Sequence, residues 1–66
     1  MNIIRIKTSL VHARMDAMML TTAELAKYIG VTPSTMSRIL TTGTCFPTTM
    51  GRLARVLCIN AWELVA

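Results

Sequence analysis

Residues 22–40, with the sequence TAELAKYIGVTPSTMSRIL, decide the fold because they contain two short helical patterns separated by a glycine. In the first pattern Leu25 and Ile29 lie one turn apart on the same helix face. Gly30 follows directly, and glycine commonly ends a helix by adopting the left-handed conformation. The first half of the stretch therefore predicts a helix over residues 22–29 that stops at a tight turn.

The second helical pattern starts at Thr32 and Pro33. Threonine is a good N-cap, and proline suits the first helical position because the N–H that it lacks would have no partner there. From this point Met36, Ile39 and Leu40 recur at the spacing of one helix face. We therefore predict a second helix from Pro33 to Leu40 that buries this apolar face.

Two helices joined in this way form a helix-turn-helix, and the segment resembles that of the Cro and repressor family of phages and bacteria. The resemblance rests on apolar and small residues at the family's fixed spacings: Leu25, Ala26, Ile29, Gly30, Val31, Met36 and Ile39. Residues 47–64 look like the family's fourth and fifth helices, so the match extends over most of the chain. Thr41-Thr42-Gly43 departs from the family's acidic residue, asparagine and glycine, so this loop is expected to differ in shape.

This resemblance implies sequence-specific binding of double-stranded DNA by a small transcriptional repressor or Cro-like regulator, with the second helix of the pair in the major groove. Five residues on the first two turns of that helix are expected at base edges: Pro33, Ser34, Thr35, Ser37 and Arg38. Arg38 is the strongest candidate, because a guanidinium can donate two hydrogen bonds to one guanine. The alternatives for Arg38 are a phosphate contact or an ordinary solvated charge.

Contacts to the DNA backbone are expected from hydroxyls near helix ends and from one lysine: Thr22, Thr32, Thr42, Thr44 and Lys27. Phosphate oxygens accept hydrogen bonds without regard to base sequence, and a lysine adds long-range attraction. Each threonine taken alone is more typical of a cap or a turn. Their clustering at helix ends and after residue 40 is what favours DNA.

The rest of the chain predicts three more helices in an all-α, five-helix domain. These helices are expected over residues 9–19, 48–57 and about 60–65, with a loop over residues 41–47. Asn60 and Glu63 have the spacing of a capping box at the start of the last helix. The core faces of the first and fourth helices are expected to carry Val11, Met15, Met18, Met50, Leu53, Ala54 and Leu57.

Residues 2–7 are rich in β-branched side chains and alternate in part, with Ile4 and Ile6 on one face and Arg5 and Lys7 on the other, which predicts a short strand. The alternative is that the first helix extends back through Ile3 and Ile6, but Ser9 as an N-cap favours the strand. Such a strand would have an open edge. We expect that edge to pair either with residues 64–66 or with another subunit.

Length and charge agree with a single nucleic-acid-binding domain spanning residues 1–66. Seven Lys and Arg against three Asp and Glu give a formal charge of +4, and the sequence pI is about 9.8. The chain has neither an apolar run of about 18 residues, as a membrane span requires, nor a signal-peptide pattern. A cytoplasmic, nucleoid-associated protein without a membrane partner is therefore expected.

Catalysis and metal binding are not expected. The carboxylates of Asp16, Glu24 and Glu63 are scattered, and the chain offers no nucleophile with an adjacent base, so we expect neither an enzyme nor a cofactor. Cys45 and Cys58 lie thirteen positions apart without a second Cys or His pair, which argues against zinc. Cys58 is expected to be a small core residue.

A homodimer on a palindromic operator is expected, because two-fold DNA sites mirror protein symmetry. Candidate interface residues are Ile3, Arg5, Trp62 and Val65. Trp62 would either pack on a partner chain or cap its own core. We expect no effector domain after Ala66 and therefore no small-molecule effector. Two other functions stay open: an antitoxin that also binds DNA to regulate its own synthesis, and an antirepressor-like interaction module that does not bind DNA.

Overall fold

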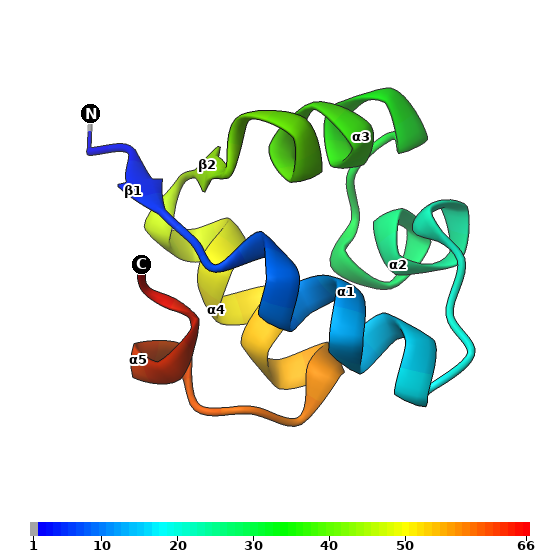
Figure 1. Cartoon of the computed structure of the whole chain (residues 1–66). Helices are drawn as coiled ribbons and strands as arrows, with labels where there is room; N and C mark the ends of the chain where they lie inside the picture. The colour runs from blue at the N-terminus through cyan, green and yellow to red at the C-terminus, as the bar shows by residue number, and fades with distance from the viewer. Residues whose placement is uncertain (1) are drawn as a thin grey trace.

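The computed structural model describes residues 2–66, which form five helices and a two-stranded sheet (Figure 1). The elements follow the chain in the order β1 (Ile4–Arg5), α1 (Thr8–Ala17), α2 (Thr22–Ile29), α3 (Pro33–Thr42), β2 (Thr44–Cys45), α4 (Pro47–Leu57) and α5 (Ala61–Leu64). The expectation of a small, mostly helical domain with an N-terminal strand is confirmed. None of the helices within residues 2–66 has the length and apolar character needed to cross a membrane.

Helices α2 and α3 begin where the sequence indicates. Thr21 and Glu24 form a capping box, in which the Glu24 N–H donates to Thr21 Oγ1 at 3.1 Å and the Thr21 N–H donates to Glu24 Oε1 at 2.9 Å. The hydrogen bond from the Thr21 backbone, together with the Thr21 side chain, lowers the pKa of Glu24 because it stabilises the carboxylate. Gly30 ends α2 with φ 80°, and Thr32 caps α3 by accepting the Thr35 N–H.

Apolar side chains from all five helices and both strands meet in one core. Its buried members are Ile6, Val11, Met15, Leu25, Ala26, Ile29, Met36, Ile39, Cys45, Leu53, Ala54, Leu57 and Leu64. The apolar faces expected on α2, α3 and α4 lie in this core, with Met50 and Leu40 half-buried at its border. Within residues 2–66 every buried side chain is apolar, so burial of hydrocarbon is what orients the helices.

Strand β1 and the residues after it occupy the middle of a small backbone ladder. On one side β1 pairs antiparallel with β2. On the other side Ile6 forms a bridge with Val65, and the Ala66 N–H donates to the Arg5 carbonyl at 2.9 Å. Pairing with the C-terminal segment, one of the two expected alternatives, is therefore what the structure shows. Within residues 2–66 the backbone at Arg5 and Ile6 is therefore paired on both sides.

The prediction of a loop over residues 41–47 is wrong, because most of these residues belong to helices or to a strand. Thr41 and Thr42 extend α3, and each hydroxyl donates to the carbonyl four residues earlier at 2.9 Å. Gly43 then ends α3 with φ 71°, and the next two residues form β2. The partner strand of β2 lies at the other end of the chain, so no local pattern indicates it.

The start of α1 and the burial of Met18 also differ from expectation. Helix α1 begins at Thr8, so Ser9 is not its N-cap. Lys7 occupies that position without a side-chain cap, since a lysine side chain has no acceptor, and its backbone N–H donates to the Leu64 carbonyl at 2.8 Å. The ladder therefore sets the start of α1. Since α1 ends before residue 18, Met18 leaves the helix face and is 38% exposed instead of lying in the core.

Two expectations near the C-terminus are wrong as well. Cys58 is exposed because it follows α4 in the left-handed conformation, with φ 59°, which turns it away from the core. Asn60 and Glu63 do not form a capping box. The Asn60 Nδ2 donates to Glu63 Oε1 at 3.0 Å instead, and the Asn60 side chain caps no backbone N–H.

Replacing Gly30 with alanine should lower the free energy of unfolding by about 1 kcal/mol, because its left-handed backbone strains any residue that has a Cβ. Steric clash is not the cause, since an added Cβ would lie 3.6 Å from Arg52 Nη1, an ordinary contact. Gly51→Ala is the matched control. It lies in the exposed middle of α4 and should raise stability by about 0.5–1 kcal/mol. Urea unfolding measures both, and an unchanged stability of Gly30→Ala would contradict this account.

Candidate nucleic-acid interface

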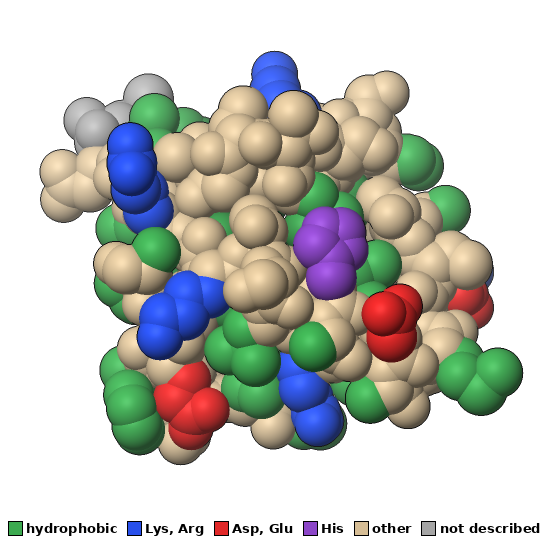
Figure 2. Space-filling model, in the orientation of Figure 1, with side chains coloured by type: hydrophobic (Ala, Val, Ile, Leu, Met, Phe, Trp, Pro, Cys, Tyr) green, Lys and Arg blue, Asp and Glu red, His purple; other side chains and the backbone are tan. Residues whose placement is uncertain are grey.

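One face of α3 is an exposed polar surface made by Ser34, Ser37, Arg38 and Thr41, which we name the outer face of α3. These positions recur at i, i+3, i+4 and i+7, so they share one side of the helix, opposite its buried stripe. In Figure 2 the surface over α3 consists mainly of uncharged polar groups, with a basic side chain rising from it. Helix α3 contains no acidic residue, so this face has no charge that repels an anion.

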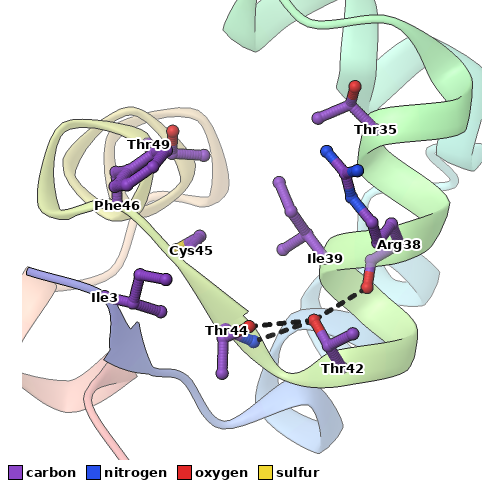
Figure 3. A pocket seen from close by; sticks show the side chains of 9 residues that line it. All are labelled: Ile3, Thr35, Arg38, Ile39, Thr42, Thr44, Cys45, Phe46 and Thr49. Atoms are coloured by element: carbon purple, nitrogen blue, oxygen red, sulfur yellow. Dashed lines mark hydrogen bonds between the residues drawn. The ribbon is translucent and has the colours of Figure 1, made fainter. Parts of the chain in front are cut away.

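A groove of about 250 Å³ lies between α3 and the start of α4 (Figure 3). Its lining residues are Ile3, Thr35, Arg38, Ile39, Thr42, Thr44, Cys45, Phe46 and Thr49. The floor is apolar and includes the buried Ile39 and Cys45. Burial raises the pKa of the Cys45 thiol, which keeps it neutral and inert. Arg38 extends along α3 towards Thr35 at the rim.

A hydroxyl network links the end of α3 to β2 at one end of this groove (Figure 3). Thr42 Oγ1 donates to the Arg38 carbonyl at 2.9 Å, accepts the Thr44 N–H at 3.4 Å and lies 3.0 Å from Thr44 Oγ1. Each hydroxyl has a single proton. Because Thr42 gives its proton to Arg38, Thr44 must be the donor within the hydroxyl pair. Neither threonine then has a proton for a phosphate, which only accepts hydrogen bonds.

A second hydroxyl pair lies at the start of α3. Thr32 Oγ1 accepts the Thr35 N–H at 3.2 Å and donates to Thr35 Oγ1 at 2.9 Å. The oxygen of Thr32 therefore caps the helix and its proton is donated to Thr35 Oγ1, while the proton of Thr35 remains for an outside acceptor. In this arrangement Thr35 is the external donor of the pair.

The residues proposed from the sequence for DNA contacts fall into separate places. Four of them, Thr35, Arg38, Thr42 and Thr44, share the groove between α3 and α4. Pro33, Ser34 and Ser37 are exposed on α3 outside the groove, whereas Thr22 is half-buried at the first position of α2. Lys27 lines a different groove, between α2 and α4.

The four residues expected at a dimer interface are all exposed, near the chain ends that lie on the same side of the molecule in Figure 1. Trp62 is 74% exposed, so the alternative that it caps its own core is wrong. In the backbone ladder Val65 forms a bridge with Ile6, and the next residue, Ala66, donates to the Arg5 carbonyl. Ile3 differs from them because it lines the groove between α3 and α4.

The sequence-based set omitted three residues that belong to this surface. Thr41 completes the outer face of α3, and helical spacing from Ser34 could have found it. Phe46 and Thr49 line the groove because the chain turns from β2 directly into α4. No local pattern marks Phe46, since that turn depends on pairing with β1.

Two of the seven basic residues stabilise the fold by donating side-chain hydrogen bonds to backbone carbonyls. The Arg14 Nε donates to the Leu57 carbonyl at 3.0 Å, and the Arg52 Nη1 donates to the Ile29 carbonyl at 3.2 Å. Both arginines therefore lie at helix C-termini, where the helix dipole favours a positive charge. Arg52 is exposed and has this structural role in addition.

Comparison of the chain with protein-family models, with curated proteins and with solved structures found no match. Within residues 2–66 no three His, Cys, Asp or Glu side chains come together as a metal site would require. The chemistry of this surface must therefore be judged from its own residues.

Thr42→Val should lower the free energy of unfolding by about 1 kcal/mol, because it removes the hydroxyl that joins Arg38 and Thr44. Thr48→Val is the matched control, since Thr48 is exposed on the first turn of α4. Its effect should stay within about 0.5 kcal/mol. Thermal unfolding compares them, and equal stability of the two variants would show that the hydroxyl network contributes nothing.

Proposed function

We propose that this chain binds double-stranded DNA in a sequence-specific manner, with α3 in the major groove. The observation that carries the proposal is the outer face of α3, where exposed hydroxyls and one guanidinium project from a helix whose opposite face is anchored in the core. A helix with its side chains is about 10–12 Å across, which matches a major groove about 12 Å wide.

The chemistry of α3 suits the recognition of a short base sequence. Arg38 can donate both of its terminal N–H groups to guanine O6 and N7, which no other base pair accepts in the same geometry. Ser34 and Ser37 can donate to or accept from several bases. Pro33 and the methyl group of Thr35 offer apolar contact to a thymine methyl group. Discrimination would therefore depend mainly on Arg38.

In this proposal α2 and α3 act as a helix-turn-helix of the Cro and repressor type. Helix α2 would cross the DNA backbone, with Thr22 on its first turn, while the turn at Gly30 sets the angle at which α3 enters the groove. Among the threonines near the groove, Thr35 has a hydroxyl proton free for an acceptor. Backbone contact by Thr32, Thr42 or Thr44 would require their hydroxyls to rotate away from their present acceptors.

The proposed biological role is a small repressor or Cro-like regulator that acts as a homodimer and blocks its operator by occupancy. Two α3 helices related by a two-fold axis would contact a palindromic site, which doubles the number of bases that are recognised. Trp62 and Val65 supply exposed apolar surface for the contact between subunits. Neither catalysis nor a cofactor enters this mechanism.

Arg38→Ala should weaken binding to a selected operator by about 1–3 kcal/mol and should relax preference at one base pair. Lys7→Ala removes the same charge from an exposed position outside α3 and should leave base preference unchanged. Electrophoretic mobility shifts with single-base operator variants measure both effects. Unaltered preference in Arg38→Ala would remove this residue from base recognition, and a uniform loss across all sequences would assign it to phosphates.

Sedimentation of the wild-type chain at micromolar concentration should show a dimer, and Trp62→Ala should shift the equilibrium towards monomer because it deletes the largest exposed apolar side chain. Trp62 is also the single tryptophan. Its fluorescence emission should therefore move to shorter wavelength as dilute protein associates. A wild-type monomer at these concentrations would overturn the dimer and this role of Trp62.

A further inference from the structure

A second groove, of about 340 Å³, lies between the C-terminal end of α2 and the middle of α4. Its floor includes Ile29 and Val56, and its rim carries Lys27, Tyr28 and Arg55. Arg52 also lines it, but this arginine already donates to the Ile29 carbonyl. The groove therefore combines an apolar strip with cationic side chains.

The charge around this groove has one sign. Three of the seven basic residues line it, and none of the three acidic residues does. Lys27 and Arg55 are exposed, so their charges face solvent. A concentration of like charge at a groove attracts an oppositely charged partner and accelerates its association.

Tyr28 adds an aromatic contact to the rim. It is 63% exposed and is one of only three aromatic residues in the chain. A tyrosine presents a flat apolar ring and a hydroxyl, which is why tyrosine is enriched at protein interfaces. With Ile29 and Val56 below it, the ring provides contact area that charge alone would not supply.

None of the residues on the outer face of α3 lines this groove. A ligand in the groove and the bases contacted by α3 would therefore use different side chains. Lys27, expected from the sequence to contact the DNA backbone, is the one residue of that set in this groove.

We propose that this groove binds an acidic, partly apolar segment of a partner protein. Carboxylates of such a segment would pair with Lys27 and Arg55, and its apolar side chains would lie on the Ile29–Val56 strip beside Tyr28. A polypeptide fits the groove better than a small anion does. Small ligands are usually bound with most of their surface enclosed, whereas this groove is open to solvent.

The same features favour a polypeptide over nucleic acid. Phosphates are typically held by Arg and Lys together with hydroxyls, backbone N–H groups and helix N-termini, so cationic side chains alone do not distinguish a phosphate from a carboxylate. This groove has no serine or threonine in its lining and lies at the C-terminal end of α2, so it offers neither hydroxyl donors nor the N–H groups of a helix N-terminus. Its apolar floor is of no use to a phosphate backbone but can accept leucine or similar side chains.

The test is a fluorescence anisotropy titration of a labelled peptide in which glutamate alternates with leucine. Arg55→Glu should weaken binding of this peptide about tenfold, because it replaces an attraction with a repulsion. Lys7→Glu makes the same change in net charge at an exposed position outside the groove and should weaken binding by less than about twofold. Tyr28→Ala, which keeps the charge, should weaken binding about threefold.

Far-ultraviolet circular dichroism of each variant checks the fold, and Arg55→Gln gives a milder change with the same expected direction. Equal weakening by Arg55→Glu and Lys7→Glu would reduce the effect to net charge and overturn the proposal, as would absence of peptide binding. A random-sequence duplex that displaces the peptide, and whose own affinity falls more in Arg55→Glu than in Lys7→Glu, would assign the groove to nucleic acid. The proposed DNA-binding function is tested separately, because operator preference depends on α3. Absence of operator preference would therefore leave the peptide-binding results unchanged.

Discussion

The burial of Met36 and Ile39 fixes the rotation of α3 about its own axis, and the chemistry of the proposed DNA-binding surface follows from that rotation. These side chains are 0% and 7% exposed, and they pack into the core shared with α2 and α4. When one stripe of a helix is buried, the residues on the opposite face of that helix necessarily face solvent. Ser34, Ser37 and Arg38 therefore face solvent as a group. Any rotation that withdrew Arg38 would expose apolar surface and lose the free energy of its burial.

The backbone ladder around β1 holds the ends of this arrangement together. A chain of 66 residues buries only about 60% of the surface of its unfolded form, so contacts outside the helix core matter. The ladder joins the N-terminal strand to Gly43 at the end of α3 and to Leu64 at the end of α5, through hydrogen bonds of 2.9 and 2.8 Å. The ladder also places the start of α4 beside α3. The groove that Arg38 lines lies between these two helices. The position of the surface thus depends on contacts far apart in the sequence.

The sequence predicted correctly those features of the fold that depend only on residues close together in the chain. Gly30, Thr32 and Pro33 mark the turn between α2 and α3, because capping and left-handed glycine act within a few residues. The errors lie where distant contacts override local preference. β2 forms only because β1 pairs with it, and Lys7 starts α1 only because Leu64 accepts its N–H. Helical spacing predicts the outer face of α3 from the sequence. The position of Phe46 and the groove between α2 and α4 could not be predicted, because they depend on how distant elements pack in three dimensions.

Selection of bound duplexes from a random DNA pool tests the central claim most directly. If α3 enters the major groove of a dimer, the recovered sequences should share a two-fold symmetric site. Its half-sites should be separated by about 10 base pairs, one helical turn. A guanine should recur at one position in each half-site, as the partner of the Arg38 guanidinium. Recovery of sequences without a common motif, at an affinity no greater than that of the unselected pool, would contradict the claim.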